Sequence, residues 1–184
     1  MADHEKDPLA RLAGLADSVD ETFASIQTRQ GACMQCRAGC TDCCRARLTI
    51  THVEAAFFRR GLARLPEAER KDLAQRTRDK TRDMCPALDP EGRCQLYDSR
   101  PLICRSFGVP LRRRREVVLV NPIVIDACDL NFVDVPLETL PAEDVLDQTS
   151  LDTELAAINA EFCARHDLPT DERIGIAQIL ASLD

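Results

Sequence analysis

Five cysteines fall within twelve residues of this 184-residue chain, and no other feature restricts its fold as strongly. Cys33, Cys36, Cys40, Cys43 and Cys44 follow the pattern C-x2-C-x3-C-x2-C-C. Thiolates gathered at this density are the ligands that soft metals prefer. If the last three cysteines share a helical turn, their i, i+3, i+4 spacing places them on one face. The pattern therefore predicts loops and turns gathered around a metal.

A second group of cysteines lies between residues 84 and 107, in the sequence MCPALDPEGRCQLYDSRPLICRSF. The group consists of Cys85, Cys94 and Cys104. Two prolines and a glycine between the first two cysteines predict a turn-rich loop. The dipeptide Arg100-Pro101 predicts the start of a short helix that carries the third. These features are typical of a second half-site, and we expect this stretch to meet Cys40–Cys44 at one metal centre.

The state of the ten cysteines depends on the compartment. The first residues, MADHEKDPLARL, carry charges where a signal peptide needs an apolar run, and no later stretch is long and apolar enough to span a bilayer. We therefore expect a cytoplasmic protein with no membrane partner, in which thiols stay reduced and serve as ligands. Because the number of cysteines is even, a disulfide framework is the alternative.

Charge is divided unevenly along a chain whose net charge is −7. Residues 31–120 carry 19 Lys and Arg against 11 Asp and Glu, whereas residues 121–184 carry 2 against 14. Arginines near the cysteines can stabilise negatively charged metal–thiolate groups. The run Arg112–Arg115 offers a nucleic-acid alternative, since arginine contacts phosphates. The acidic balance and the few aromatic residues argue against that partner, and favour a solvated turn or a docking point for the acidic C-terminal part.

Apolar periodicity predicts a mainly α fold with a small β-hairpin and cysteine-rich loops between helices. Helices are expected from Asp7-Pro8 to Ile26, from the capping box at Thr51 and Glu54 to Gly61, and over residues 67–82. The hairpin is expected from Val109–Leu111 and Val117–Val120 around Arg112–Arg115, with a third β-prone run at residues 123–125. Cys163, beside Phe162 on an amphipathic helix, is expected to be a small buried apolar residue.

Together the two cysteine groups resemble the YkgJ-type CxxCxxxxCC cysteine-cluster family of candidate zinc- or iron-chelating domains. The stretch Cys40-Thr-Asp-Cys43-Cys44 is similar to the C-x2-CC end of the family motif. Residues 85–107 follow the pattern CPxL, GxCxxY and RPxxCRxF. The resemblance implies metal ligands at Cys36, Cys40, Cys43, Cys44, Cys85, Cys94, Cys104 and Cys128. It leaves Cys33 as an alternative to Cys36, because six residues separate Cys36 from Cys43, whereas the family motif has four at this place.

Motifs and charge together predict an organisation in three parts: an N-terminal helix at residues 1–30, a cysteine-cluster metal-binding domain at 31–135 and an acidic helical C-terminal part at 136–184 that packs on the core. Both zinc and iron–sulfur clusters use four thiolates. We prefer an iron–sulfur cluster over zinc, because the thiols outnumber one tetrahedral set and the adjacent cysteines suggest more than one metal. Electron transfer with a protein redox or client partner would then be the role.

Three other functions stay open at this point. One is a structural zinc module that binds another protein, and a second is the nucleic-acid reading above. A third is a dithiol redox pair at Cys33-x2-Cys36, although the βαβ context of such motifs is absent. The sequence contains no Ser-His-Asp set, P-loop, dinucleotide fingerprint or HExxH motif. An enzymatic role, if there is one, would therefore be oxidoreduction at the metal.

Overall fold

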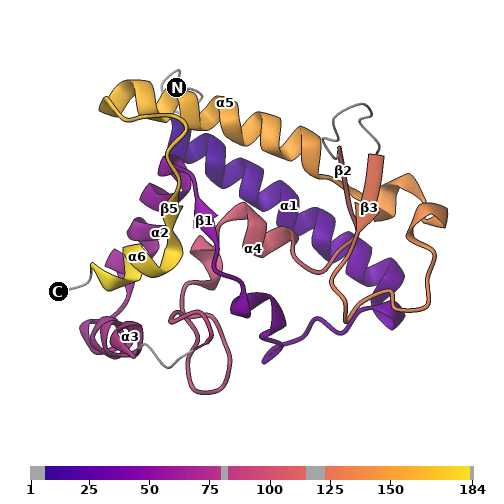
Figure 1. Ribbon diagram of the computed structural model, residues 1–184, viewed down its shortest axis with the longest axis horizontal. Helices are drawn as coiled ribbons and strands as arrows, with labels where there is room; N and C mark the ends of the chain where they lie inside the picture. Colours follow the sequence, from indigo (N-terminus) through magenta and orange to yellow (C-terminus); the bar gives the residue numbers. More distant parts are fainter. Residues whose placement is uncertain (1–6, 80–82, 115–122, 183–184) are drawn as a thin grey trace. The chain divides into compact units, whose positions relative to one another are not determined.

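Helices form most of the protein, and short strands form two small sheets (Figure 1). This computed structural model describes residues 7–79, 83–114 and 123–182. Loops and short 3-10 helices between the α-helices carry most of the cysteines. The predicted fold class, mainly α with a small β component, is confirmed.

The described residues contain six α-helices, five strands and five short 3-10 helices. The α-helices are α1 (Pro8–Gln30), α2 (His52–Arg64), α3 (Glu67–Arg78), α4 (Leu102–Ser106), α5 (Gln148–His166) and α6 (Ile176–Ala181). The strands are β1 (Thr49–Ile50), β2 (Leu111–Arg114), β3 (Ile123–Asp126), β4 (Leu146–Asp147) and β5 (Ile174–Gly175). The 3-10 helices are η2 (Gly31–Cys33), η3 (Asp42–Arg45), η4 (Tyr97–Ser99), η5 (Leu137–Thr139) and η6 (Ala142–Asp144). None of these helices is long and apolar enough to cross a membrane.

Local signals predicted the first three helices, although α1 continues to Gln30 and α2 to Arg64, beyond the expected ends at Ile26 and Gly61. The start of α2 is the predicted capping box: the Thr51 hydroxyl accepts the Glu54 N–H at 3.4 Å, and the Glu54 carboxylate accepts the Thr51 N–H at 3.0 Å. This exchange satisfies two backbone donors that the first turn of a helix leaves open. Helix α3 ends at Arg78, and residues 80–82 of the predicted polar helix lie outside the described residues.

The chain divides into two compact units, each assembled from segments that are far apart in the sequence. Unit 1 contains Met1–Leu12, Arg37–Pro101 and Ile158–Asp184. Unit 2 contains Ala13–Cys36 and Leu102–Ala157. The sequence-based division into residues 1–30, 31–135 and 136–184 follows motifs and charge, and it stays a prediction.

Unit 1 is built around α2, α3 and α6. Strands β1 and β5 pair in antiparallel fashion, with Ile50 opposite Ile174. Helix α6 packs on α3 and α2, and Leu73, Ile179 and Leu180 are fully buried in these helices. Gly61 brings α2 unusually close to η4, because a Cβ at this position would lie 2.5 Å from Ser99 Cβ. This close approach holds the segment that follows Cys94 against a helix.

Unit 2 contains the other sheet, in the order β3-β2-β4. β2 pairs in antiparallel fashion with β3 and in parallel with β4. The predicted hairpin is wrong in one respect: Arg112–Arg114 lie within β2, and its partner is the third β-prone run, now β3. Val117–Val120 and Arg115 lie outside the described residues. An apolar cluster completes the unit, with Ile26, Met34, Val109 and Phe132 buried at its centre.

Acidic partners explain why these arginines extend along a strand. Arg113 forms an ion pair with Asp126 of β3 at 2.5 Å, and Arg112 forms one with Asp147 of β4 at 2.9 Å. Opposite charges on neighbouring strands stabilise such a pairing register. Asp147 belongs to the acidic C-terminal part of the sequence. The ion pairs agree with the interpretation of the arginine run as a docking point for that part.

Candidate metal centre

The two units divide the cysteines between them. Unit 1 contains Cys40, Cys43, Cys44, Cys85, Cys94 and Cys163. Unit 2 contains Cys33, Cys36, Cys104 and Cys128. All ten are present as thiols; nine are partly exposed and Cys163 is fully buried, as predicted for a small apolar residue. Leaving out Cys163, five thiols of unit 1 and four of unit 2 are accessible enough to receive a metal.

The adjacent cysteines of unit 1 point their sulfurs to the same side. Cys43 and Cys44 lie in η3, and their Sγ atoms are 4.0 Å apart. Zn–S bonds of about 2.3 Å in a tetrahedron place two sulfurs about 3.8 Å apart. The pair is therefore close to the spacing that one tetrahedral metal requires. The argument from sequence that adjacency implies more than one metal has no support in this geometry.

Two cysteine-bearing loops of unit 1 meet at their backbones. The Cys85 N–H donates to the Cys44 carbonyl at 2.8 Å. Gly92, with a φ of +77°, lies so close to the other loop that a Cβ would be 2.9 Å from Thr41 Cγ2 and 3.4 Å from the Gly39 carbonyl oxygen. Only glycine combines this left-handed backbone with such an approach at low cost. Two cysteine-bearing segments about forty residues apart in the sequence are thus in contact through their backbones.

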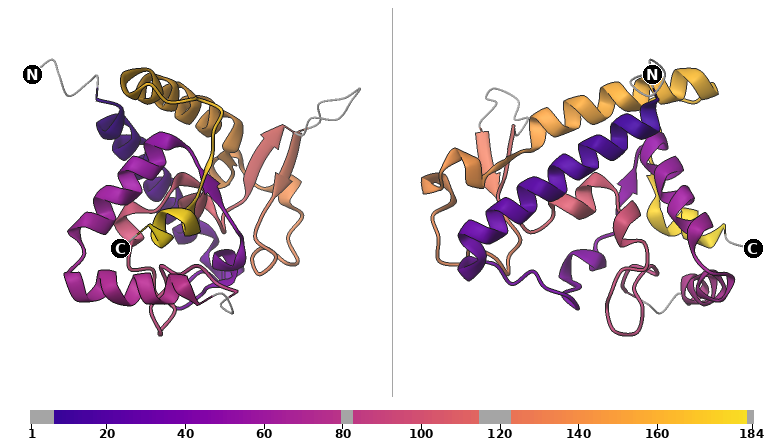
Figure 2. Two further views of the ribbon diagram at one scale, coloured as in Figure 1. Left: turned by 60° about the vertical axis from the view of Figure 1, so that its left-hand side comes forward. Right: turned by 180° about the vertical axis from the view of Figure 1, so that it is seen from behind.

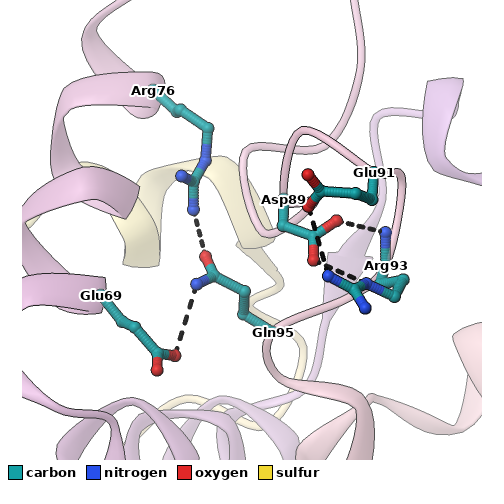
Figure 3. A network of polar contacts seen from close by, with 6 residues as sticks. All are labelled: Glu69, Arg76, Asp89, Glu91, Arg93 and Gln95. Atoms are coloured by element: carbon teal, nitrogen blue, oxygen red, sulfur yellow. Dashed lines mark hydrogen bonds and ion pairs between the residues drawn. The ribbon is translucent and has the colours of Figure 1, made fainter.

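The loop from Cys85 to Cys94 turns back on itself, as the right-hand view of Figure 2 shows. An antiparallel bridge joins Leu88 to Cys94, and the Gln95 N–H donates to the Ala87 carbonyl at 2.9 Å. At the tip of the loop, Arg93 holds Asp89 through two contacts of 2.7 and 2.9 Å (Figure 3). These bonds make the loop a small self-supporting structure.

Arg76 of α3 holds both ends of this loop. Its Nε donates to the carbonyl of Pro86, the residue after Cys85, at 3.1 Å. Its Nη2 donates to the side chain of Gln95, the residue after Cys94, and Gln95 in turn donates to Glu69 at 3.4 Å (Figure 3). A planar guanidinium with several donors suits such a double contact. Arg76 therefore fixes the distance between two predicted ligands from outside the cysteine motif.

Two of these thiols have shifted acidity in opposite directions. The hydrogen bond from Cys44 lowers the pKa of Cys43 to about 7, against the effect of burial and with help from the charge of Arg100. Burial raises the pKa of Cys94 to about 11, and the neighbouring thiols Cys85 and Cys43 add to the rise while Arg100 opposes it. Because metals bind the thiolate, a metal at Cys94 would have to displace its proton.

In unit 2, the segment around Asn131 contacts Cys33 and Cys36, the front cysteine pair. Asn131 Nδ2 donates to Cys36 Sγ at 3.2 Å, and the Asn131 backbone N–H donates to the Cys128 carbonyl at 2.8 Å. The next N–H, of Phe132, donates to the Cys33 carbonyl at 2.8 Å. The segment from Cys128 to Phe132 therefore lies against both front cysteines. Sequence reasoning missed Asn131, because one asparagine outside any motif carries no local signal.

Cys104 lies on α4 of unit 2, one residue before a buried arginine. Arg105 is 4% exposed and forms an ion pair with Asp20 of α1. A guanidinium buried to this extent requires a carboxylate or other acceptors nearby. The pair ties α4, and with it Cys104, to the long helix of the same unit.

The profile of the CxxCxxCC family, described as a candidate zinc- or iron-chelating domain, matches residues 26–119. The chain belongs to this family. No curated protein and no solved structure matches it. The matched region contains seven of the eight predicted ligands, and Cys128 lies beyond it. The predicted family resemblance is confirmed.

The donor set suits the chelating role that describes the CxxCxxCC family. Nine thiols are partly exposed in loops and short helices, and thiolate is the donor that zinc and iron–sulfur clusters share. Within the described ranges, no three Cys, His, Asp or Glu side chains already surround a point where a metal ion could sit. The assignment of individual ligands stays a prediction.

Proposed function

We propose that this chain binds an iron–sulfur cluster, or zinc in its place, through two sets of cysteine thiolates, one in each compact unit. The observation that carries the proposal is the meeting of the cysteine loops within unit 1. There the Cys85 backbone bonds to that of Cys44, whose sulfur lies 4.0 Å from that of its neighbour Cys43. Soft metals bind such closely spaced thiolates with high affinity.

Unit 1 contains enough thiols for a site of four thiolates, and unit 2 supplies three or four. Unit 1 supplies Cys40, Cys43, Cys44, Cys85 and Cys94. Unit 2 supplies Cys36, Cys104 and Cys128, with Cys33 as the fourth or as the alternative to Cys36. Four thiolates are the usual number for structural zinc and for iron–sulfur clusters alike. A reducing compartment such as the cytoplasm would keep these thiols available for the metal.

Arginine near the thiols supports the iron–sulfur form. The guanidinium of Arg100 lies 3.5 Å above the Tyr97 ring, and its charge lowers the pKa of both Cys43 and Cys94. A fixed positive charge of this kind stabilises a cluster with net negative charge and shifts its reduction potential. The role that follows is electron transfer with a protein redox partner. If the protein is an enzyme, the reaction is an oxidoreduction at this cluster.

Structural zinc is the second candidate, and one distance favours it. The 4.0 Å between the sulfurs of Cys43 and Cys44 is close to the edge of a zinc–thiolate tetrahedron, about 3.8 Å. In that form the metal would fix the two loops of unit 1 and stabilise the fold, and the protein would act as an interaction module.

Serine substitutions test the proposal at single ligands. Cys43→Ser and Cys94→Ser should each lower the metal content of the purified protein, because a hydroxyl is a poor replacement for a thiolate. Cys104→Ser should lower it through the other unit. Cys163→Ser is the matched control: this buried cysteine should cost stability and leave the metal content unchanged. Full metal content in the first three variants would overturn the proposal.

A further inference from the structure

The buried side chain of Asn131 forms hydrogen bonds around Cys36, the second cysteine of the front pair in unit 2. Asn131 is 4% exposed. Its Nδ2 donates to the Gly108 carbonyl at 2.6 Å and to Cys36 Sγ at 3.2 Å, while its Oδ1 accepts the Gln35 N–H at 2.7 Å. Both hydrogens of the amide group and its oxygen therefore have partners.

Two backbone groups fix which way this amide points. The Gln35 N–H can only donate, so the atom facing it has to be the oxygen. The Gly108 carbonyl can only accept, so the atom facing it has to be the nitrogen. In a flipped amide, the nitrogen would face the Gln35 N–H, donor against donor, and the oxygen would face the Gly108 carbonyl, acceptor against acceptor. The N–H directed at Cys36 Sγ is therefore determined by its surroundings.

Gly108 completes the space around the same sulfur. Its φ is +112°, and an added Cβ would lie 2.6 Å from Cys36 Sγ and 3.3 Å from Asn131 Nδ2. The sulfur thus occupies room that exists because residue 108 has no side chain. Gly108 and Asn131, both distant from Cys36 in the sequence, thus form the space that its sulfur occupies. For Cys33, the corresponding contact is made by its backbone carbonyl, which accepts the Phe132 N–H.

We propose that Asn131 is a positioning residue that holds the Cys36 sulfur as a metal ligand, so that Cys36, and not Cys33, is the ligand of the front pair. The proposal rests on the thiolate metal binding proposed above and deepens it. An N–H donor to a metal-bound thiolate orients the sulfur and takes up part of its negative charge. Asn131 lies outside residues 26–119, which the family profile matches.

The experiment compares two isosteric substitutions in the full-length chain. Asn131→Asp keeps the oxygen that accepts from Gln35 and replaces the sulfur-directed donor with a carboxylate oxygen. Asn159→Asp is the matched control. Asn159 is also buried, accepts the Val53 N–H at 3.1 Å, donates to the Thr170 carbonyl at 3.3 Å and hydrogen-bonds a cysteine, Cys163, that is no ligand. Both substitutions should therefore disturb folding to a similar extent.

Cobalt(II) is the probe, titrated into the reduced, metal-free protein without oxygen, because its thiolate charge-transfer absorption reports the sulfur ligands. We expect Asn131→Asp to bind cobalt about 10- to 100-fold more weakly, as is typical when an outer partner of a ligand is removed. The absorption of its complex should shift to longer wavelength, since a thiolate without the hydrogen bond gives up electron density more readily. Asn159→Asp should match the wild type in both affinity and wavelength. Equal affinity and wavelength for Asn131→Asp would overturn the proposal.

The outcomes separate this proposal from the proposed function. If the wild-type protein shows no thiolate-to-cobalt absorption, the proposed function fails. If the wild type shows it and Asn131→Asp is indistinguishable, only the role of Asn131 fails. Cys36→Ser should lose one thiolate's share of the absorption, and Cys33→Ser should keep it; the reverse pattern would assign the ligand to Cys33.

A measurement on the wild type covers the case in which Asn131→Asp does not fold. The protein is loaded with zinc and treated with iodoacetamide, and labelled positions are identified by peptide fragmentation. Zinc should protect Cys36 and leave Cys33 reactive. Protection of Cys33 alone, or equal labelling of both, would refute the assignment.

Discussion

Replacing Gly92 with alanine should separate the two cysteine loops of unit 1. An added Cβ would lie 2.9 Å from Thr41 Cγ2, and the φ of +77° is left-handed. A left-handed backbone costs a residue with a Cβ roughly 1–2 kcal/mol. Forcing a methyl group against a packed neighbour costs about 1–3 kcal/mol. Since this loop can shift more than a core can, we expect the free energy of unfolding to fall by about 2–3 kcal/mol.

Urea unfolding followed by circular dichroism measures this change, with and without bound metal. The variant should also bind metal more weakly, because the substituted loop carries two predicted ligands. Adding Thr41→Ser removes the Cγ2 atom, so the double variant should recover the steric part of the loss and keep the backbone part.

The control for this experiment is Gly31→Ala, beside the other cysteine group. No atom lies within 4 Å of a Cβ at this position, and its φ is not left-handed. Its stability should change by no more than about 0.5 kcal/mol. If Gly92→Ala unfolds at the same urea concentration as Gly31→Ala, the loops do not meet as described, and the reasoning about unit 1 is wrong.

Two further predictions concern unit 1. Arg76→Ala removes the hydrogen bonds to Pro86 and Gln95, and should lower the free energy of unfolding by about 1–3 kcal/mol in total. Hydrogen exchange should become faster over residues 85–95. Unchanged exchange there would contradict the role of Arg76 in holding both ends of this loop. In the metal-free protein, alkylation should reach half its maximum rate near pH 7 at Cys43 and near pH 11 at Cys94. The pKa of Cys43 is lowered, so its contribution to stability is present above the ordinary thiol pKa and is lost as the pH falls through about 7. The pKa of Cys94 is raised, so its contribution to stability is present below the ordinary thiol pKa and is lost as the pH rises through about 11. Identical alkylation profiles for the two cysteines would refute this account.

The parts of the fold that sequence predicted well are those fixed by neighbouring residues. The capping box at Thr51 and Glu54 depends on residues three positions apart, and it forms as expected. The turns of the loop from Cys85 to Cys94 were predicted from the prolines and the glycine within the loop itself. The family motif is likewise local, and the family assignment followed from it. Local chemistry of this kind can be read from one sequence.

What sequence reasoning missed depends on distant partners. Nothing near Asn131 indicates that its amide contacts a sulfur 95 positions earlier. The strand partner of β2 was misassigned because the β-prone runs differ little, and charge pairing between Arg113 and Asp126 contributes to the register. The distribution of cysteines between two units also follows from tertiary contacts, since each unit is assembled from separated segments.

The most direct test of the central claim is the metal and sulfide content of protein purified without oxygen, measured together with its visible spectrum. Our account predicts a brown protein that contains iron and acid-labile sulfide, and whose colour is bleached by dithionite. A colourless protein with bound zinc and no iron would assign the thiolates to the structural zinc role. Protein that contains neither metal, and takes up neither when they are supplied under reducing conditions, would contradict the account.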